Sequence, residues 1–156
     1  MEVNKIEAVL DTYIISELTC ALIPTRSIDH QTKVIERDHI YYVNQSPLEI
    51  IKQNCLLNGS DYNGRREAVK YHLGYSRKSP IAISKLIYAF PTHAITHYDC
   101  IWLFSKQISY IKHISSLSKV IFKNHYILKL PISEHILNKQ HLRCFAVKNL
   151  YKSLTS

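Results

Sequence analysis

Residues 46–59, SPLEIIKQNCLLNG, carry the clearest structural signal in this sequence. Ser46 is suited to cap a helix, Pro47 fits the first helical position, and Glu49 lies where a capping box requires it. Gly59 follows where a left-handed residue commonly ends a helix. Apolar residues recur at helical spacing between these ends: Leu48, Ile51, Cys55 and Leu56. The stretch therefore predicts a helix over about 47–57 that packs on a sheet.

Short strands are expected on both sides of this helix. Runs of β-branched and aromatic residues bounded by turn residues are typical of strands. Such runs occupy residues 13–24, 79–84, 86–92, 99–105 and 108–115. Two longer runs, 32–44 and 119–131, predict hairpins that turn near residues 37–38 and near residues 123–124.

Two further segments favour helices. Residues 61–71, DYNGRREAVKY, predict a short helix after Asp61 that passes into extended chain near Tyr71. The last segment begins with a capping Ser133 and has no internal Pro or Gly, so it predicts a helix over about 134–153. Its expected inward stripe is Leu137, Cys144, Val147, Leu150 and Leu154, with Lys139, Arg143, Lys148 and Lys152 outside.

The fold class expected from these elements is α+β. It consists of a largely antiparallel β-sheet, one inserted helix and a C-terminal helix, all within a single domain over residues 1–156. Apolar residues make up 46% and charged residues 21%, which excludes a disordered tail. No apolar run is long enough to span a bilayer, and the acidic N-terminus does not resemble a signal peptide, so we expect a cytoplasmic protein.

The charge balance favours an anionic partner. Twenty Lys and Arg against twelve Asp and Glu give a formal net charge of +8. Acidic residues concentrate before position 70, and only Asp99 and Glu134 follow it. Such asymmetry is typical of a face that binds a polyanion, most often nucleic acid. A basic surface that binds nothing remains the alternative.

Residues 59–78, GSDYNGRREAVKYHLGYSRK, invite comparison with a phosphate-binding loop. Gly59 and Gly64 have the spacing of a Walker loop, but Arg65-Arg66 replace its Lys and Ser/Thr, so no hydroxyl is placed for magnesium. The sequence has no GxSxG motif and few carboxylates for acid–base chemistry. We therefore expect neither an enzyme nor a bound cofactor.

The same residues suit a contact with nucleic acid. Arg65 and Arg66 must point in different directions, so one can face a polyanion while the other pairs internally. Arg77 and Lys78 close the stretch, and Tyr62, Tyr71 and Tyr75 lie between the basic residues. Arginine forks bind phosphate and enter a narrow minor groove. The alternative is that Tyr62 and Tyr71 are core residues and one arginine holds a structural salt bridge.

Three other hypotheses stay open. Eleven tyrosines among many lysines are compatible with a non-specific module that binds single-stranded nucleic acid or RNA. His93, His97 and Cys100 are the nearest approach to a metal site, although no fourth ligand is evident and no metal is expected. The last helix is a possible recognition helix, but an amphipathic helix that closes the core fits its pattern better. The four scattered cysteines are expected to be free.

Several motifs, in order, resemble the ComK family, competence transcription factors of Gram-positive bacteria. They are YVN, PLEII, GS-Y-GR, SPI and FPT, within residues 33–133. The resemblance implies a dimeric, sequence-specific transcription activator that binds AT-rich promoter boxes in double-stranded DNA, chiefly through the minor groove. It also implies RNA polymerase and a MecA-like adaptor of an AAA+ protease as partners.

The resemblance extends the set of candidate DNA-binding residues. The motif GS-Y-GR falls on Gly59, Ser60, Tyr62, Gly64 and Arg65. It implies a DNA contact for Arg65 and, by adjacency, for Arg66 and Lys70. Other members extend beyond the last helix, whereas this sequence ends at Ser156, so the tail associated with activation and adaptor recognition is expected to be absent from it.

Overall fold

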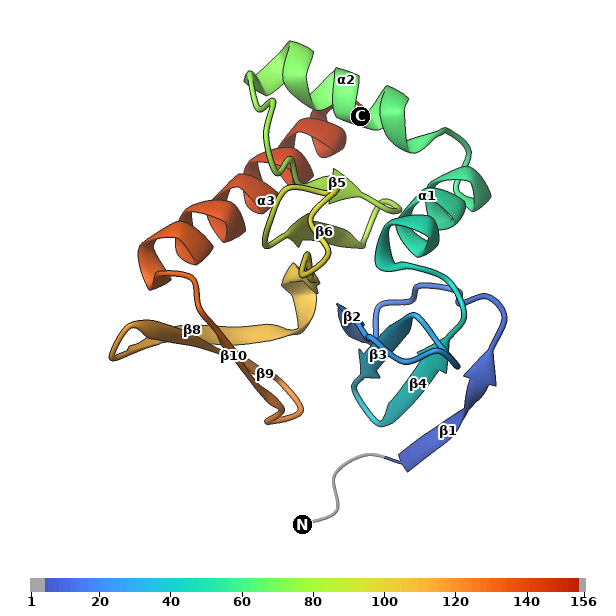
Figure 1. The fold of residues 1–156 in the computed structure, drawn as a ribbon. Helices are drawn as coiled ribbons and strands as arrows, with labels where there is room; N and C mark the ends of the chain where they lie inside the picture. Colours follow the sequence, from blue (N-terminus) through green and yellow to red (C-terminus); the bar gives the residue numbers. More distant parts are fainter. Residues whose placement is uncertain (1–4, 155–156) are drawn as a thin grey trace.

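The computed structural model describes residues 5–154 as two β-sheets and three α-helices (Figure 1). The larger sheet has the order β1-β4-β3-β2-β7-β6-β5. Its strands are β1 (Lys5–Leu10), β2 (Thr19–Pro24), β3 (Thr32–Glu36), β4 (His39–Val43), β5 (Ile81–Ala82), β6 (Tyr88–Pro91) and β7 (Trp102–Phe104). The smaller sheet has the order β10-β9-β8, with β8 (Ile108–Ile114), β9 (Leu117–Phe122) and β10 (Ile127–Leu130).

Both sheets are built largely from antiparallel neighbours, which confirms the expected α+β class. The two hairpins turn where the sequence predicts, between Glu36 and His39 and between Phe122 and Ile127. β1 was not predicted, and it pairs with β4 in parallel. Such pairing depends on residues far apart in the chain, so no local turn signal predicts it.

Helix α1 (Pro47–Leu57) has the predicted capping box. The Glu49 backbone N–H donates to Ser46 Oγ at 3.1 Å, and the Ser46 backbone N–H donates to Glu49 Oε1 at 2.7 Å. Gly59 has the expected positive φ, 102°. The packing face differs from the prediction, because Ile50 and Asn54 are buried beside Ile51 and Cys55, while Leu48 is half-buried and Leu56 is exposed.

Helix α2 spans Tyr62–Leu73 and is longer than predicted. It continues through Tyr71, where extended chain was expected, and ends at Gly74 with φ 76°. The Gly64 backbone N–H donates to Asp61 Oδ1 at 2.8 Å, which caps its first turn. The β-branched and aromatic residues near Tyr71 suggest a strand locally, but the cap and the C-terminal glycine keep the segment helical.

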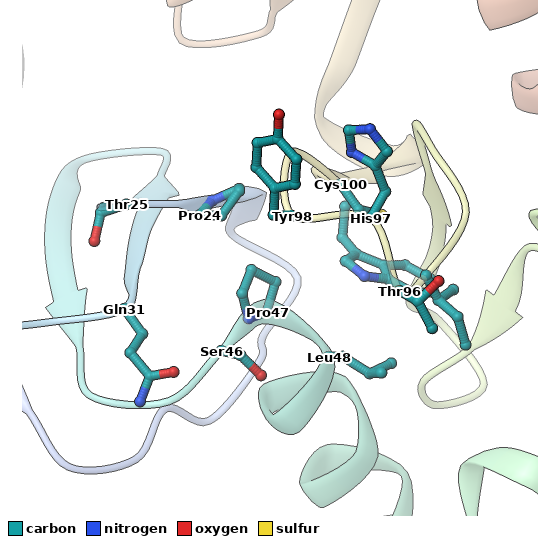
Figure 2. Close-up of a pocket in the computed structure, with 12 residues that line it drawn as sticks. Pro24, Thr25, Gln31, Ser46, Pro47, Leu48, Thr96, His97, Tyr98 and Cys100 are labelled. Carbon is teal, nitrogen blue, oxygen red and sulfur yellow. The ribbon is translucent and has the colours of Figure 1, made fainter. Parts of the chain in front are cut away.

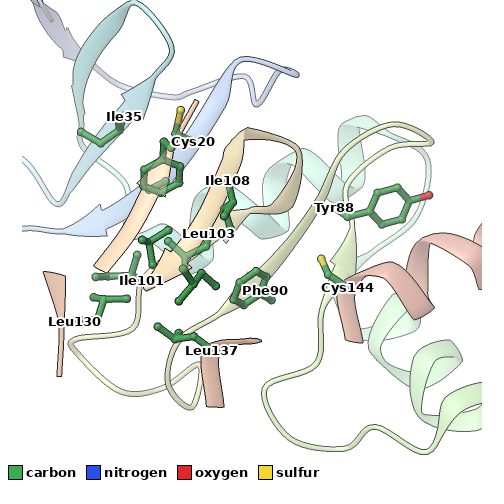
Figure 3. Packing of buried hydrophobic residues seen from close by; sticks show 14 of the residues in the cluster. Cys20, Ile35, Tyr88, Phe90, Ile101, Leu103, Ile108, Leu130, Leu137 and Cys144 are labelled. Atoms are coloured by element: carbon green, nitrogen blue, oxygen red, sulfur yellow. The ribbon is translucent and has the colours of Figure 1, made fainter. Parts of the chain in front are cut away.

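Helix α3 (Glu134–Leu154) closes one core cluster against both sheets (Figure 3). Leu137, Cys144 and Val147 are buried as predicted, whereas Leu154 is exposed. Phe90 of β6, Leu103 of β7 and Leu130 of β10 belong to the same cluster. A second cluster joins α1 to the other side of the larger sheet through residues such as Ile50, Ile51 and Trp102. Within the described residues, no helix combines the length and apolarity needed to cross a bilayer.

Candidate nucleic-acid interface

Arg65 lies in the interior, only 7% exposed, which contradicts the expectation that its guanidinium faces a polyanion. Its Nε donates to Ser60 Oγ at 2.9 Å. Nη1 donates to the carbonyls of Ala82 and Ile83 at 2.5 and 2.9 Å, and Nη2 to those of Cys55 and Asn58 at 3.1 and 3.0 Å. Arginine has five N–H donors, so this network accounts for all of them.

The contacts of Arg65 join three elements. The carbonyls of Cys55 and Asn58 belong to the C-terminal end of α1, where backbone acceptors lack intrahelical partners and a cation is favoured. Helix α1 has no basic residue in its own last turn, so Arg65 of α2 supplies that charge. The carbonyl of Ala82 ties the same side chain to β5. Arg65 therefore holds α1, α2 and β5 together.

The motif GS-Y-GR has a structural explanation in the same region. Gly59 leaves α1 with positive φ, and Ser60 accepts from Arg65. Tyr62 is buried, and its ring packs nearly perpendicular to that of Trp102, with 6.3 Å between the centroids. A Cβ on Gly64 would lie 2.8 Å from Asp61 Oδ1 and would displace the cap. The motif therefore builds the α1–α2 corner.

Arg66 points elsewhere and meets the basic residues of the following loop. Its guanidinium lies over the Tyr62 ring, 5.7 Å from the centroid. Arg66, Arg77 and Lys78 line one hollow of about 370 Å³. The rest of its wall is Tyr62, Ser76, Ser79, Ala94, Ile95 and Thr96. Three of the predicted contact residues are thus brought together, and we call this place the basic hollow.

The loop that carries Arg77 and Lys78 is held against α3. The Gln140 side chain donates from Nε2 to the Lys78 carbonyl at 2.7 Å. The Arg143 guanidinium lies 4.5 Å from the centroid of the Tyr75 ring, and Ser79 Oγ donates to the Tyr75 carbonyl at 3.1 Å. These contacts hold the backbone of this loop against α3.

Lys70 is exposed on α2 and does not line the basic hollow. It lies four residues after Arg66, so the two side chains share one flank of the helix. Tyr71 is 85% exposed and is not the core residue that one alternative expected. Lys70 therefore extends the basic surface along α2 without joining the three cations at the hollow.

Figure 2 shows a second hollow, of about 320 Å³. It adjoins the basic hollow, because both are lined by Ile95 and Thr96 of the loop between β6 and β7. Pro24 and Thr25 at the end of β2 and Pro47 at the start of α1 form the opposite wall. The sequence suggested only a metal site for this Thr- and His-rich loop. Its place in the wall of this hollow was not predicted, because that place depends on the strands that flank the loop.

The comparison with known proteins decides the family. The family model described as ComK protein matches residues 10–155. The chain belongs to the ComK family. The competence transcription factor of Bacillus subtilis (strain 168) is 33% identical to it over 145 residues, which cover 90% of this chain and 75% of the relative. No solved structure matches the chain significantly.

His93, His97 and Cys100 do not assemble the metal site considered from the sequence of this ComK-family chain. The two imidazole rings stack at 4.7 Å, and Cys100 Sγ donates to the His93 carbonyl at 3.4 Å. Among the side chains that the structure describes, no group of three His, Cys, Asp or Glu residues is arranged to hold a metal ion. Burial, with the neighbouring His97 and Lys78, lowers the pKa of His93.

All four cysteines of this ComK-family protein are free and buried, as expected. Burial is the main cause of the raised pKa of each thiol, and for Cys20 and Cys144 it raises the pKa to about 12. Thiols with a high pKa react slowly, because the thiolate is the reactive form. The cysteines are therefore suited to packing rather than to redox or nucleophilic chemistry.

Proposed function

We propose that this chain is a transcription factor that activates competence genes by binding double-stranded DNA. Its membership of the ComK family and the printed name of its Bacillus subtilis relative support the role. The formal charge of +8 suits a polyanionic partner. The family is not a class of enzymes, in keeping with the lack of catalytic motifs in the sequence.

The basic hollow is the observation that carries this proposal. Arg66, Arg77 and Lys78 meet around one concave surface, while Arg65 is committed to the interior. AT-rich minor grooves are narrow and strongly negative, and arginine inserted there reads groove shape rather than base edges. We propose that Arg66 and Arg77 face such a groove, with Lys78 and Lys70 near phosphates.

Specificity in this proposal comes from paired sites. The minor groove distinguishes A·T from G·C but not A·T from T·A, so a single AT-rich box gives little discrimination among AT-rich sequences. Two copies of the chain on adjacent boxes would read their spacing as well. The proposal also includes a dimer or dimer pair, a single DNA-binding domain over residues 1–156 and a cytoplasmic location beside the chromosome. Its other expected partners are RNA polymerase and a MecA-like adaptor.

A single-strand-binding module is the second candidate. Tyr71, Tyr98 and Tyr110 are all more than half exposed, and exposed tyrosine rings can stack on bases. They belong to three separate segments, namely α2, the loop between β6 and β7, and β8. This separation favours binding to duplex DNA over binding to a single strand.

Titration of the full chain against three DNA molecules tests the proposal. They are a duplex with A-tracts, a G·C-rich duplex of equal length and the A-rich single strand. We expect the A-tract duplex to bind at least about tenfold more tightly than the other two at physiological salt, because groove shape and the basic hollow favour it. Equal affinity for both duplexes would contradict minor-groove selectivity, and tighter binding to the single strand would favour the second candidate.

A further inference from the structure

The smaller sheet carries three lysines in one row. Lys119 of β9 lies directly opposite both Lys112 of β8 and Lys129 of β10. Side chains directly opposite each other on neighbouring strands point to the same side of a sheet. The next row consists of Ile111, Val120 and Leu128, and it packs in the core. Because side chains alternate along a strand, the lysine row points away from the core.

This arrangement is unfavourable without a counter-charge. Neighbouring strands are about 4.8 Å apart, and like charges directly opposite each other destabilise a sheet. The sequence has no Asp or Glu between Asp99 and Glu134, so the smaller sheet contains no carboxylate. Within the described part of the chain, the ion pairs Arg26–Asp99 and Lys106–Glu17 lie elsewhere. The lysine row therefore calls for an external anion.

The surroundings of the row indicate an extended ligand. One neighbouring row on the same face is Tyr110, Ile121 and Ile127, and the other is Ile114 with Leu117. Lysine stems lie readily along such apolar side chains and leave the ammonium groups at the tip. The result is a flat cationic strip across three strands rather than a pocket for one small anion.

We propose that Lys112, Lys119 and Lys129 bind the phosphate backbone of duplex DNA as a second contact, separate from the basic hollow. The proposal rests on the DNA-binding function proposed above. Duplex DNA carries one charge per roughly 1.7 Å of axis, so a row of ammonium groups meets several phosphates without reading sequence. No local pattern predicted this surface, because it depends on the register of three strands.

The position of the row sets what it contributes. In Figure 1 α2 lies at the top of the view and the smaller sheet lies well below it, at the lower left, with α3 between them. The phosphates bound by the lysine row therefore lie outside the box that is bound at the basic hollow. The row adds affinity and lengthens the footprint, and it leaves the preference for A·T over G·C unchanged.

The salt dependence of binding tests this contact. The variant Lys112→Gln/Lys119→Gln/Lys129→Gln removes the row, and Lys52→Gln/Lys139→Gln/Lys148→Gln removes the same charge from exposed helix positions. We expect the row variant to flatten the slope of log affinity against log salt by roughly 2–3 units on an A-tract duplex, and the control by less than about one. Melting of both variants checks that they fold.

The outcomes separate this contact from the function on which it rests. If the row variant keeps the wild-type slope of log affinity against log salt while the wild-type protein binds DNA, the proposed contact is wrong and the proposed function stands. Equal flattening in both variants also overturns it, because net charge alone would then suffice. A wild-type protein that binds no duplex removes both proposals. Loss of binding to phosphatidylserine vesicles with an unchanged DNA slope would assign the row to a membrane instead.

A positional measurement supports the same test. Ser116 is exposed in the turn between β8 and β9, and the four native cysteines are buried, so Ser116→Cys offers a selective position for an iron chelate. We expect localised cleavage of the DNA backbone beside the A-tract. Absence of cleavage in a complex that forms with wild-type affinity would contradict a contact at the lysine row.

Discussion

Two adjacent arginines have opposite environments in this protein. Arg65 donates to four backbone carbonyls and one hydroxyl in the interior, whereas Arg66 lies over Tyr62 beside the basic hollow. Neighbouring positions on a helix differ by about 100°, so one faces the core and the other does not. The sequence correctly predicts that the two diverge. It cannot tell which one is internal, because the partners of Arg65 are spread over residues 55–83.

Substitution of Arg65 therefore tests stability rather than DNA contact. Arg65→Ala leaves several buried carbonyls without donors, and hydrogen bonds to charged groups contribute about 1.5–3 kcal/mol each. We expect the free energy of unfolding to fall by at least about 3 kcal/mol in urea titrations. Arg66→Ala is the matched control, with a loss of about 1 kcal/mol or less. A folded Arg65→Ala protein of wild-type stability that loses DNA affinity would restore the contact role.

At the scale of elements, local signals predict well and distant pairings do not. The capping box of α1 and the two hairpin turns depend on residues within a few positions of each other, and all three are present. The full length of α2 was missed because the residues around Tyr71 have weak helix propensity. β1, the buried face of α1 and the basic hollow depend on contacts between segments far apart in the chain, and sequence spacing does not encode them.

The packing of α3 against β6 makes stability depend on pH. The His141 ring stacks on Phe90 at 5.7 Å, and its Nε2 is buried with no hydrogen-bond partner among the described residues. Burial lowers the pKa of His141 below 6.5, so as the pH falls the unfolded chain takes up a proton on this ring before the folded protein does. The contribution of the neutral His141 ring to the free energy of unfolding is therefore complete above about pH 6.5 and is lost as the pH falls below it.

Replacement of this histidine isolates its effect. We expect the free energy of unfolding of His141→Phe to fall less steeply than that of wild type between pH 7 and pH 5, by at most about 1.4 kcal/mol per pH unit. His135→Gln, at an exposed position of the same helix, should keep the wild-type slope. Urea titrations at several pH values measure both. Identical slopes in the two variants would show that burial of His141 has no linkage to folding.

At the scale of the whole molecule, two regions of the fold present basic side chains on separate surfaces. The α1–α2 corner, held by Arg65, and the loop held by Gln140 bring Arg66, Arg77 and Lys78 together. The smaller sheet aligns its own lysines by strand register. Family membership could be inferred from short motifs in the sequence, but one of them, GS-Y-GR, builds the α1–α2 corner that supports the basic hollow and does not itself supply the three cations that line it.

One measurement tests the central claim that the basic hollow binds duplex DNA. The variant Arg66→Ala/Arg77→Ala/Lys78→Ala is compared with wild type in titrations of an A-tract duplex over a range of salt concentrations. We predict that the slope of log affinity against log salt flattens by about 2–3 units, with a melting temperature close to that of wild type. A folded variant that keeps both the wild-type slope and the wild-type affinity would contradict the account.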